Sequence, residues 1–365
     1  MQRLIMLPGP TNVSERVINA MTRPIINHRG DKFRELYRGI VEKSRHLFQT
    51  DGDIVVFSSS GTGGVEAAVL NSVYHGDKVI VPVMGEFSQR LGEMVEIAGG
   101  KLVSVSSELG NAPGLDEIKN AIDSNPDASS IMIVHNETST GIALPYLKEL
   151  CSYAKDRGLA VVVDAISSLG GYSIPVDSWG IDICVTGSQK CLAAPPGLAL
   201  LSIGKEHVSR IKQKKPSTRY FDIARYLDYQ KRWETPFTPN LPLFYALDEA
   251  LNELLEEGLA SRVERHERMS KMLYSGLARL GLRFVAREEV RSRTVAATFY
   301  PEGIEDRQFR SRLEQEFGVT IAGGFGKFSG KVFRIGCMGL INQEFVERTL
   351  SAVESLLSPS LYKEV

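Results

Sequence analysis

Two apolar segments of the sequence lead into residues whose side chains can carry out chemistry. Residues 159–163 are followed by Asp164, and residues 181–185 are followed by Thr186-Gly-Ser-Gln and then by Lys190. We predict that both segments are short buried strands. In a parallel sheet the carboxyl ends of the strands lie along one edge, which is where open α/β sheets bind ligands. The sequence therefore predicts that a carboxylate and an amine face one crevice.

A carboxylate and an amine in one crevice suit the chemistry of pyridoxal 5'-phosphate (PLP). The amine of a lysine forms a Schiff base with the aldehyde, and an aspartate keeps the pyridine nitrogen protonated so that the ring accepts electrons. Each residue also has an ordinary alternative. An aspartate at the end of a strand often caps a helix, and a lysine after Gly-Ser-Gln often lies in a solvated loop. The pair alone leaves both interpretations open.

The composition argues against several other classes of protein. The chain has 365 residues, of which 43% are hydrophobic and 24% charged, and its formal net charge is −1. These values are typical of a globular protein. Because no basic stripe with interleaved aromatic residues occurs, we expect no binding to nucleic acid. No apolar run is long enough to span a membrane and no signal peptide is evident, so we expect no membrane contact and a cytoplasmic location.

Cysteine and histidine spacing gives no indication of a metal site. The four cysteines are Cys151, Cys184, Cys191 and Cys337, and none of them forms a CxxC pair. The six histidines show neither HxxxH nor HExxH spacing. We therefore expect neither a metal ion nor a redox dithiol.

The order of apolar and amphipathic segments predicts the fold class. Predicted strands and helices alternate from about residue 53 to residue 203, which is typical of an α/β fold with a mostly parallel sheet and helices on both faces. The later part of the chain mixes helices with a few short strands, which predicts a smaller α+β domain. We divide the chain into an N-terminal arm (residues 1–14), a large domain (15–258) and a small C-terminal domain (259–365).

Three further segments at predicted strand ends suit a PLP site. The glycine-rich loop Gly61-Thr-Gly-Gly64 precedes a helix predicted to begin at Val65, so its amides would bind a phosphate. Phe87 follows the next strand and would stack on a pyridine ring, or would pack in the core at a helix start. The polar residues 135–141 follow a buried strand and would line a cleft, because polar groups are costly in a core. Glycine-rich turns are common, so the loop is a weak signal by itself.

These segments, in this order, resemble those of class V aminotransferases, and in particular the alanine–glyoxylate and serine–pyruvate aminotransferase group. The resemblance covers nearly the whole chain. Its most specific motif is the run Gly187-Ser-Gln-Lys-Cys-Leu-Ala-Ala-Pro-Pro-Gly197. The resemblance implies the PLP-dependent transferase type I architecture and transfer of an amino group from alanine or serine to glyoxylate or pyruvate. The other matching motifs are Pro8-Gly-Pro10, Gly61-Thr-Gly-Gly64, Glu137-Thr-Ser-Thr-Gly141, Val163-Asp164, Ser168-Leu-Gly-Gly171 and Lys331-Val-Phe-Arg-Ile-Gly336.

The resemblance implies a role for each matching residue. Lys190 matches the Schiff-base lysine, which also moves a proton during the reaction, and Asp164 matches the partner of the pyridine nitrogen. Phe87, where close relatives often have Trp, and Ile166 match the residues on the two faces of the ring. Arg334 matches the arginine that binds the substrate carboxylate. The remaining matches bind the cofactor, with Thr138 near its phenolic oxygen and Thr62, Gly63, Gly64 and Gln189 around its phosphate.

The resemblance also implies a homodimer with shared active sites. Thr235 and Thr238 lie in a proline-rich loop and match residues that reach the phosphate in the other subunit, although Thr235 stands where some relatives have Tyr. We expect an obligate twofold dimer. The N-terminal arm has no evident partner within its own chain, so we expect the other subunit to be a candidate for holding it.

Other functions on the same fold stay open at this point. A cysteine desulfurase needs a nucleophilic cysteine on a mobile loop, whereas Cys337 lies in a predicted strand and is expected to be a buried thiol. The sequence does not point to the extra basic residues that a phosphoserine aminotransferase needs. An aminoethylphosphonate transaminase is harder to exclude. The alternative from another class is a PLP-free subunit of a larger complex. A single substrate-binding arginine favours substrates with one carboxylate over aspartate or glutamate.

Overall fold

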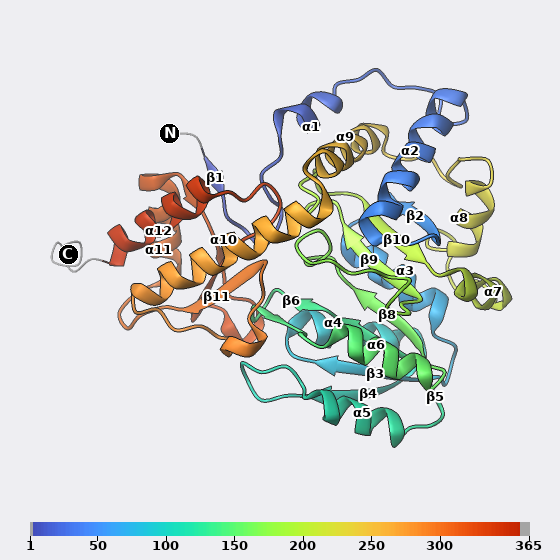
Figure 1. The fold of residues 1–365 in the computed structure, drawn as a ribbon, viewed down its shortest axis with the longest axis horizontal. Coiled ribbons are helices and arrows are strands. Elements are labelled where there is room, and N and C mark those ends of the chain that lie inside the picture. Colours follow the sequence, from blue (N-terminus) through green and yellow to red (C-terminus); the bar gives the residue numbers. More distant parts are fainter. Residues whose placement is uncertain (1–2, 358–365) are drawn as a thin grey trace.

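The computed structural model describes residues 3–357, which form a larger and a smaller unit (Figure 1). The larger unit is built on a seven-stranded sheet, in which β10 runs antiparallel to both of its neighbours and the other strands are parallel to one another. The mixed, mostly parallel sheet confirms the predicted fold class. In spatial order the strands are β2 (Asp53–Phe57), β10 (Ala199–Ile203), β9 (Ile183–Gly187), β8 (Ala160–Asp164), β5 (Ala128–Val134), β3 (Lys78–Val83) and β4 (Lys101–Ser106).

Both faces of the large sheet are buried by helices. Successive side chains of a strand point to opposite faces, and on β2 Ile54 and Val56 pack into one core while Val55 and Phe57 pack into the other. Burial of one such side chain contributes about 1.5–3 kcal/mol, so apolar side chains on both faces hold the strand inside the sheet. The first core includes α2 (Asp31–Phe48), α5 (Leu115–Asp123), α6 (Leu147–Asp156) and α9 (Leu241–Glu257), and the second includes α3 (Gly61–Ser72), α4 (Glu86–Ile97), α7 (Lys205–Gln213) and α8 (Ile223–Gln230).

The two strands that precede Asp164 and Lys190 are parallel neighbours, as predicted. Asp164 at the end of β8 lies opposite Val185 of β9. The predicted limits of the second strand are wrong by two residues at each end, because β9 begins at Ile183 and continues to Gly187. The segment from Ser188 to Lys190 therefore leaves the sheet at the same edge as Asp164.

The glycine-rich segment is the first turn of a helix, and its prediction as a loop is wrong. The helix α3 begins at Gly61, and the Ser60 hydroxyl caps it by accepting the amide of Gly63 at 3.3 Å. A Cβ on Gly64 would lie 2.8 Å from the Cβ of Ala199. The helix therefore lies so close to the sheet that only glycine fits there, and this packing outweighs the low helix propensity of glycine.

The smaller unit contains a three-stranded antiparallel sheet and three helices. The sheet has the order β11 (Val295–Phe299), β14 (Val332–Gly336) and β13 (Ala322–Gly323). It packs with α10 (Leu259–Arg279), α11 (Asp306–Phe317) and α12 (Gln343–Leu357). The predicted boundary at Gly258 falls between α9 and α10, and the division into domains stays an interpretation of the sequence. The remaining elements are α1 (Glu15–Ala20), the short hairpin of β6 (Asn136–Glu137) and β7 (Ile142–Ala143), and the 3-10 helices Glu288–Val290 and Gly326–Phe328.

The N-terminal arm docks on its own chain. Its strand β1 (Leu4–Ile5) pairs in parallel with β12 (Val319–Thr320), and Leu4 and Met6 are buried in the core of the smaller unit. The expectation that the arm lacks a partner within the chain is therefore wrong. The pairing of this strand could not be predicted from the sequence, because a two-residue strand has no hydrophobic periodicity.

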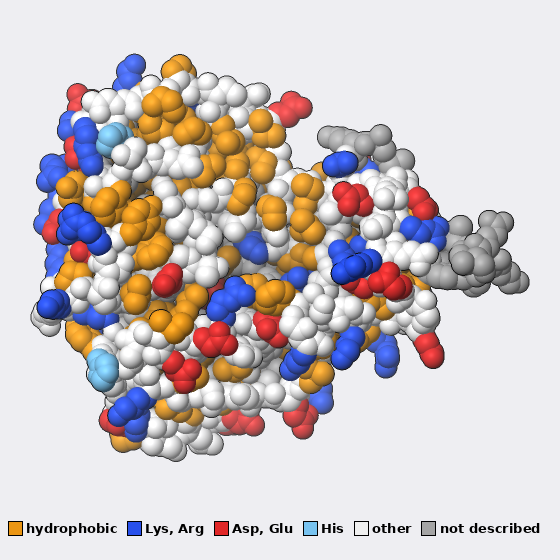
Figure 2. Space-filling view, turned by 180° about the vertical axis from the view of Figure 1, so that it is seen from behind, with side chains coloured by type: hydrophobic (Ala, Val, Ile, Leu, Met, Phe, Trp, Pro, Cys, Tyr) orange, Lys and Arg blue, Asp and Glu red, His pale blue; other side chains and the backbone are white. Residues whose placement is uncertain are grey.

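Seen from behind, the surface is hollowed where the two units meet, and Lys or Arg side chains are visible in the hollow (Figure 2). Of the helices within residues 3–357, none has both the length and the apolar character needed to cross a membrane.

Candidate active site

A cavity lies at the carboxyl edge of the large sheet. The strands β2, β3, β5, β8 and β9 are mutually parallel, so the residues that follow them meet at this edge. Seven of the residues predicted for the site line the cavity together, from five separate segments of the chain. They are Thr62, Phe87, Thr138, Asp164, Ile166, Gln189 and Lys190.

The amine of Lys190 lies against the N-terminal arm. Its Nζ donates a hydrogen bond to the Pro8 carbonyl. Gly9 has φ +89°, and a Cβ there would lie 2.5 Å from Cδ of Lys190, so the contact requires glycine. Burial, with a smaller contribution from the charge of Arg334, lowers the pKa of Lys190 to about 8. A larger fraction of this amine is therefore unprotonated at neutral pH than in an ordinary lysine.

Asp164 is a carboxylate with few partners of its own. Its Oδ1 accepts the amide of Ile166 at 2.9 Å. Burial raises the pKa of Asp164 to about 6, against the opposing effect of the Ile166 amide. An ionised Asp164 would therefore be stabilised by a protonated nitrogen in the cavity. Ile166 packs on α3, where a Cβ on Gly61 would lie 2.8 Å from its Cδ1.

A buried carboxylate fixes the position of Phe87. Glu137 is fully buried and accepts the backbone amides of Phe87 and Ser88, at 3.1 and 2.9 Å, and the Ser88 hydroxyl at 3.0 Å. Its other oxygen accepts the Ser139 hydroxyl at 2.6 Å. These bonds hold the first turn of α4, where the helix dipole favours a negative charge. The sequence analysis included Glu137 in the polar segment 135–141 and in a matching motif but assigned it no role, because the amides that it accepts belong to a distant segment of the chain.

The ring of Phe87 also contacts the smaller unit. It stacks on Phe325 with centroids 5.9 Å apart and planes 15° apart. The guanidinium of Arg90 lies 5.0 Å from the centroid of Phe87 and 5.8 Å from that of Phe325. Arg90 lines the cavity, as do Asn136 and Ser167, which are joined by a hydrogen bond of 2.7 Å. The sequence interpretation that the site offers a single arginine is therefore incomplete.

Arg334, on β14, does not itself line the cavity, but it contacts Thr138, which does. Its Nε donates to the Gly323 carbonyl at 2.8 Å and its Nη1 donates to the Thr138 carbonyl at 3.1 Å. Among the described residues, no hydrogen bond engages its Nη2. Arg334 is thus held at the junction of the two units, and its Nη2 can still donate hydrogen bonds to a ligand.

Four of the predicted cofactor residues lie outside the cavity of a single chain. Gly63 and Gly64 turn toward the body of the protein, and a Cβ on Gly63 would meet the side chains of Ser59 and Phe221. Thr235 is buried, and its hydroxyl donates to the Phe237 carbonyl at 2.7 Å. Thr238 is exposed on the surface. The predicted roles of Thr235 and Thr238 depend on a second subunit and stay predictions.

The groups around the cavity fit PLP. The N-terminus of α3 and the Thr62 hydroxyl offer donors to a phosphate. Oε1 of Gln189 is buried without a hydrogen-bond partner within the described part of the chain, and the NH₂ group of the same side chain is the part that could donate to a phosphate. A carboxylate, a lysine amine and flat apolar side chains complete the set that PLP requires.

Comparisons with known proteins agree with this fit. The family model of class V aminotransferases matches residues 9–333. An uncharacterised aminotransferase of Methanocaldococcus jannaschii is 40% identical, with 98% of this chain and 93% of that protein covered. A protein of Synechococcus named soluble hydrogenase, small subunit, is 32% identical, with 97% of this chain and 93% of that protein covered.

Relatives with a named transaminase activity are similar over the same length. The alanine–glyoxylate aminotransferase of Drosophila melanogaster is 33% identical, with 98% of this chain and 93% of that protein covered. The crystal structure of the alanine–glyoxylate aminotransferase of a Nostoc species has a TM-score of 0.93 and 30% identity, with 98% of this chain and 96% of that chain covered. The chain therefore belongs to the class V aminotransferases, a family of PLP-dependent transaminases.

Proposed function

We propose that this protein binds PLP and transfers the amino group of alanine or serine to glyoxylate or pyruvate. The observation that carries the proposal is the meeting of Lys190 and Asp164 in one cavity, with Arg334 bonded to the carbonyl of Thr138, a lining residue. The similarity to alanine–glyoxylate aminotransferases supports the choice of substrates.

Each side of the cavity suits one part of the cofactor. Thr62, the first amides of α3 and Gln189 would bind the phosphate, and Phe87 and Ile166 would enclose the ring. The carboxylate of Asp164 would hold the proton on the ring nitrogen. When bound, PLP supplies an aldehyde that condenses with an amine and a ring that accepts electrons from the substrate carbon.

Lys190 would move the proton of the reaction. Because its pKa is lowered to about 8, part of the amine is free base at neutral pH and can accept the proton from the substrate Cα. The protonated Lys190 would then hold this proton on its Nζ and could donate it within the cavity. Burial of the site excludes competing water during the transfer.

Arg334 would bind the substrate carboxylate, because a planar guanidinium matches a carboxylate with two parallel hydrogen bonds. Its bonds to the Gly323 and Thr138 carbonyls hold the guanidinium in place. Arg90 is a second cation at the cavity, so the charge of the site does not by itself exclude a donor with two acidic groups. The choice of alanine or serine thus depends on the relatives and requires a direct test.

The test is a half-reaction screen with the PLP-loaded protein. Alanine, serine, aspartate, phosphoserine and aminoethylphosphonate are each added, and the visible spectrum is followed as the pyridoxal form is replaced by the pyridoxamine form. We expect conversion with alanine and serine. Conversion with aspartate alone, or with a phosphorus-containing donor alone, would show that the proposed donors are wrong.

The protein is also proposed to act as a homodimer. Ile18 and Ile25 expose 51% and 70% of their surface, and hydrophobic side chains gather on the upper part of the larger unit as seen from behind (Figure 2). A second copy would cover such an apolar surface. Sedimentation of the active protein tests this proposal, and a fully active monomer would contradict it.

A second candidate is a subunit of a larger complex without transaminase activity, because the Synechococcus relative is named as a hydrogenase subunit. An intact Lys190 and Asp164 at the cavity favour the enzyme. A folded protein that gains no visible absorbance with PLP would favour the subunit. A desulfurase has less support, since Cys337 is 1% exposed and burial raises the pKa of its thiol.

A further inference from the structure

Arg262 is a fully buried arginine outside the cavity, on the helix α10 that runs between the two units (Figure 1). Its Nε and Nη2 both donate to the carbonyl of Cys191, at 3.2 and 2.7 Å, and its Nη1 donates to Glu257 at 2.8 Å. Burial of a guanidinium is costly unless its donors are used, and an apolar side chain would fill the same space at a lower cost. The burial of an arginine at this position therefore indicates that its two hydrogen bonds to the Cys191 carbonyl have a function.

The carbonyl that Arg262 holds belongs to the turn that follows Lys190. In this turn Ala193 has φ +57°, a left-handed conformation that residues with a Cβ rarely adopt. The turn is closed by bonds from the Ala193 amide to the Lys190 carbonyl and from the Ala194 amide to the Ser188 carbonyl, both 3.0 Å long. Strained turns of this kind persist only where the surroundings hold them in place.

The next turn of α10 holds the chain beyond the strand that carries Arg334. His266 Nε2 accepts the amide of Gly339 at 3.1 Å, and Nδ1 must then carry the proton that it donates to the Arg262 carbonyl at 2.7 Å. Gly339 in turn lies against the turn after Lys190, because a Cβ there would be 3.2 Å from the Lys190 carbonyl oxygen.

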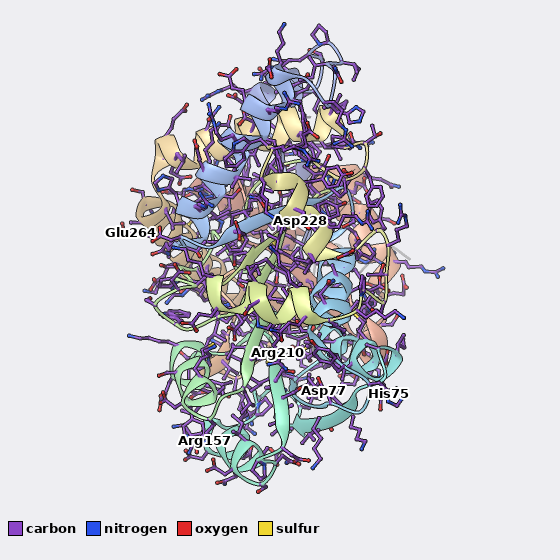
Figure 3. All side chains as sticks on the ribbon, turned by 90° about the vertical axis from the view of Figure 1, so that its right-hand side faces the viewer. His75, Asp77, Arg157, Arg210, Asp228 and Glu264 are labelled. Carbon is purple, nitrogen blue, oxygen red and sulfur yellow. The ribbon has the colours of Figure 1, made fainter. Side chains whose placement is uncertain are left out.

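A shared carboxylate ties the two sets of contacts together. Arg265 pairs with Glu257 at 2.6 Å and donates to the Gly339 carbonyl at 3.1 Å. Glu257 therefore accepts from both Arg262 and Arg265, so one short stretch of α10 fixes the turn after Lys190 and the segment after β14. The opposite face of the helix is free of these contacts, since Glu264 points away from the body of the molecule (Figure 3).

We propose that Arg262 is a positioning residue that sets the direction of the Lys190 amine toward the cavity and relative to Arg334. It does so by holding the Cys191 carbonyl and, with it, the left-handed turn at Ala193. The proposal rests on the proposed function in that Lys190 is taken as the reacting amine.

The test compares Arg262→Met with Arg268→Met, which removes an exposed arginine from the same helix. In Arg262→Met, Glu257 keeps its pair with Arg265, so no buried carboxylate is left alone. Amide hydrogen exchange of residues 188–198 is measured in the apoproteins, and kcat, KM and the visible spectrum against pH are measured in the PLP-loaded proteins. We expect faster exchange in Arg262→Met alone, with kcat lower by about 100-fold, as for a catalytic group displaced by about 1 Å.

Two further variants separate positioning from mere stability. Arg262→Lys keeps the charge but loses the fork, so we expect an intermediate kcat and a changed pH dependence of the spectrum. Ala193→Gly removes the strain of the turn, so it should restore part of the kcat when it is added to Arg262→Met. If Arg262→Met does not fold, Arg262→Lys with and without Ala193→Gly gives the same comparison.

Unchanged exchange in residues 188–198 together with a kcat within about threefold of the wild type, a loss of about 0.65 kcal/mol or less, would overturn the proposal. So would an equal effect of Arg268→Met. A different outcome is faster exchange in the Arg262→Met apoprotein together with a PLP-loaded wild type that shows no transamination. That outcome would contradict the proposed function but would show that Arg262 holds the turn.

Discussion

The carboxyl edge of the large sheet and the loop from residue 235 to 242 differ in how they present the residues predicted to bind the cofactor. At the sheet edge, residues from five segments line one cavity. In the loop, the Thr235 hydroxyl is bonded to the Phe237 carbonyl, and Thr238 faces solvent. Parallel strands bring their ends together within one chain, whereas Thr235 and Thr238 of the loop do not line the cavity of their own chain.

The loop is nevertheless held in a defined shape. Arg29 donates to the Thr235 carbonyl, and Arg34 pairs with Glu234 at 2.8 Å. Three prolines restrict its backbone further. A preset loop loses little entropy when it docks, so an outward Thr238 is consistent with a contact that a second subunit completes. The comparison leads to four predictions on single variants, given from the largest expected effect to the smallest, and to a fifth on mixed dimers.

Replacement of Lys190 by alanine is expected to abolish transamination. No other amine lines the cavity among the described residues, since the only other basic side chain there is the guanidinium of Arg90. PLP should still bind through the phosphate donors and Asp164. Steady-state assays and equilibrium dialysis check the two statements, and normal turnover in this variant would remove Lys190 from the mechanism.

Replacement of Asp164 by asparagine is expected to lower the single-turnover rate by orders of magnitude without loss of the fold. An amide cannot keep the ring nitrogen protonated, so the ring loses its capacity to accept electrons. The variant is measured at saturating cofactor. A loss smaller than about tenfold, or about 1.4 kcal/mol of barrier, would be too small for the proposed role.

The same substitution should stabilise the apoprotein at pH 7. The pKa of Asp164 is raised from 3.8 to about 6, so between these values the folded state binds more protons than the unfolded state. The free energy of unfolding therefore falls as pH rises from about 4 to 6, and it stays lower by the same amount at pH 7. Asparagine avoids the cost, which amounts to about 1–3 kcal/mol.

Urea unfolding of the two apoproteins at pH 7 and pH 4 measures this difference. The advantage of the asparagine variant should be present at pH 7 and be several-fold smaller at pH 4, where the carboxyl group is protonated in the folded state and partly protonated in the unfolded state. An apoprotein that loses stability at pH 7 on this substitution would mean that Asp164 has a partner that stabilises its charge.

The sequence predicted the parts of the site that follow strand ends and missed those that depend on packing. Asp164 and Lys190 were expected at one edge of the sheet because each comes at the end of, or shortly after, an apolar segment, and both line the cavity. The start of α3 at Gly61 was missed because its cause is the close contact of Gly64 with Ala199, which no local pattern contains. Arg90 was missed although it lies one helical turn after Phe87, because the side of the helix that faces the cavity depends on how the helix packs on the sheet.

The smallest expected effect concerns Thr235 and Thr238, which the structure presents differently. Thr238→Val should weaken PLP binding about tenfold in the dimer, the value of one hydrogen bond to a charged phosphate, and leave stability unchanged. Thr235→Val should leave PLP binding unchanged and lower the stability by about 1 kcal/mol, because its hydroxyl bonds within the loop. Dialysis with PLP and urea unfolding of both variants separate the two effects.

Mixed dimers test whether the site is shared between subunits. Chains with Lys190→Ala are combined with chains carrying Thr238→Val, under exchange conditions and at a PLP concentration that saturates only intact sites. In a mixed dimer one site then carries both changes, while the other combines an intact Lys190 with an intact Thr238 from the opposite subunit. Activity should rise above the mean of the two parents. An unchanged activity despite demonstrated subunit exchange would mean that Thr238 does not contribute to the active site of the other subunit. The loop would then differ from the sheet edge only in its exposure to solvent.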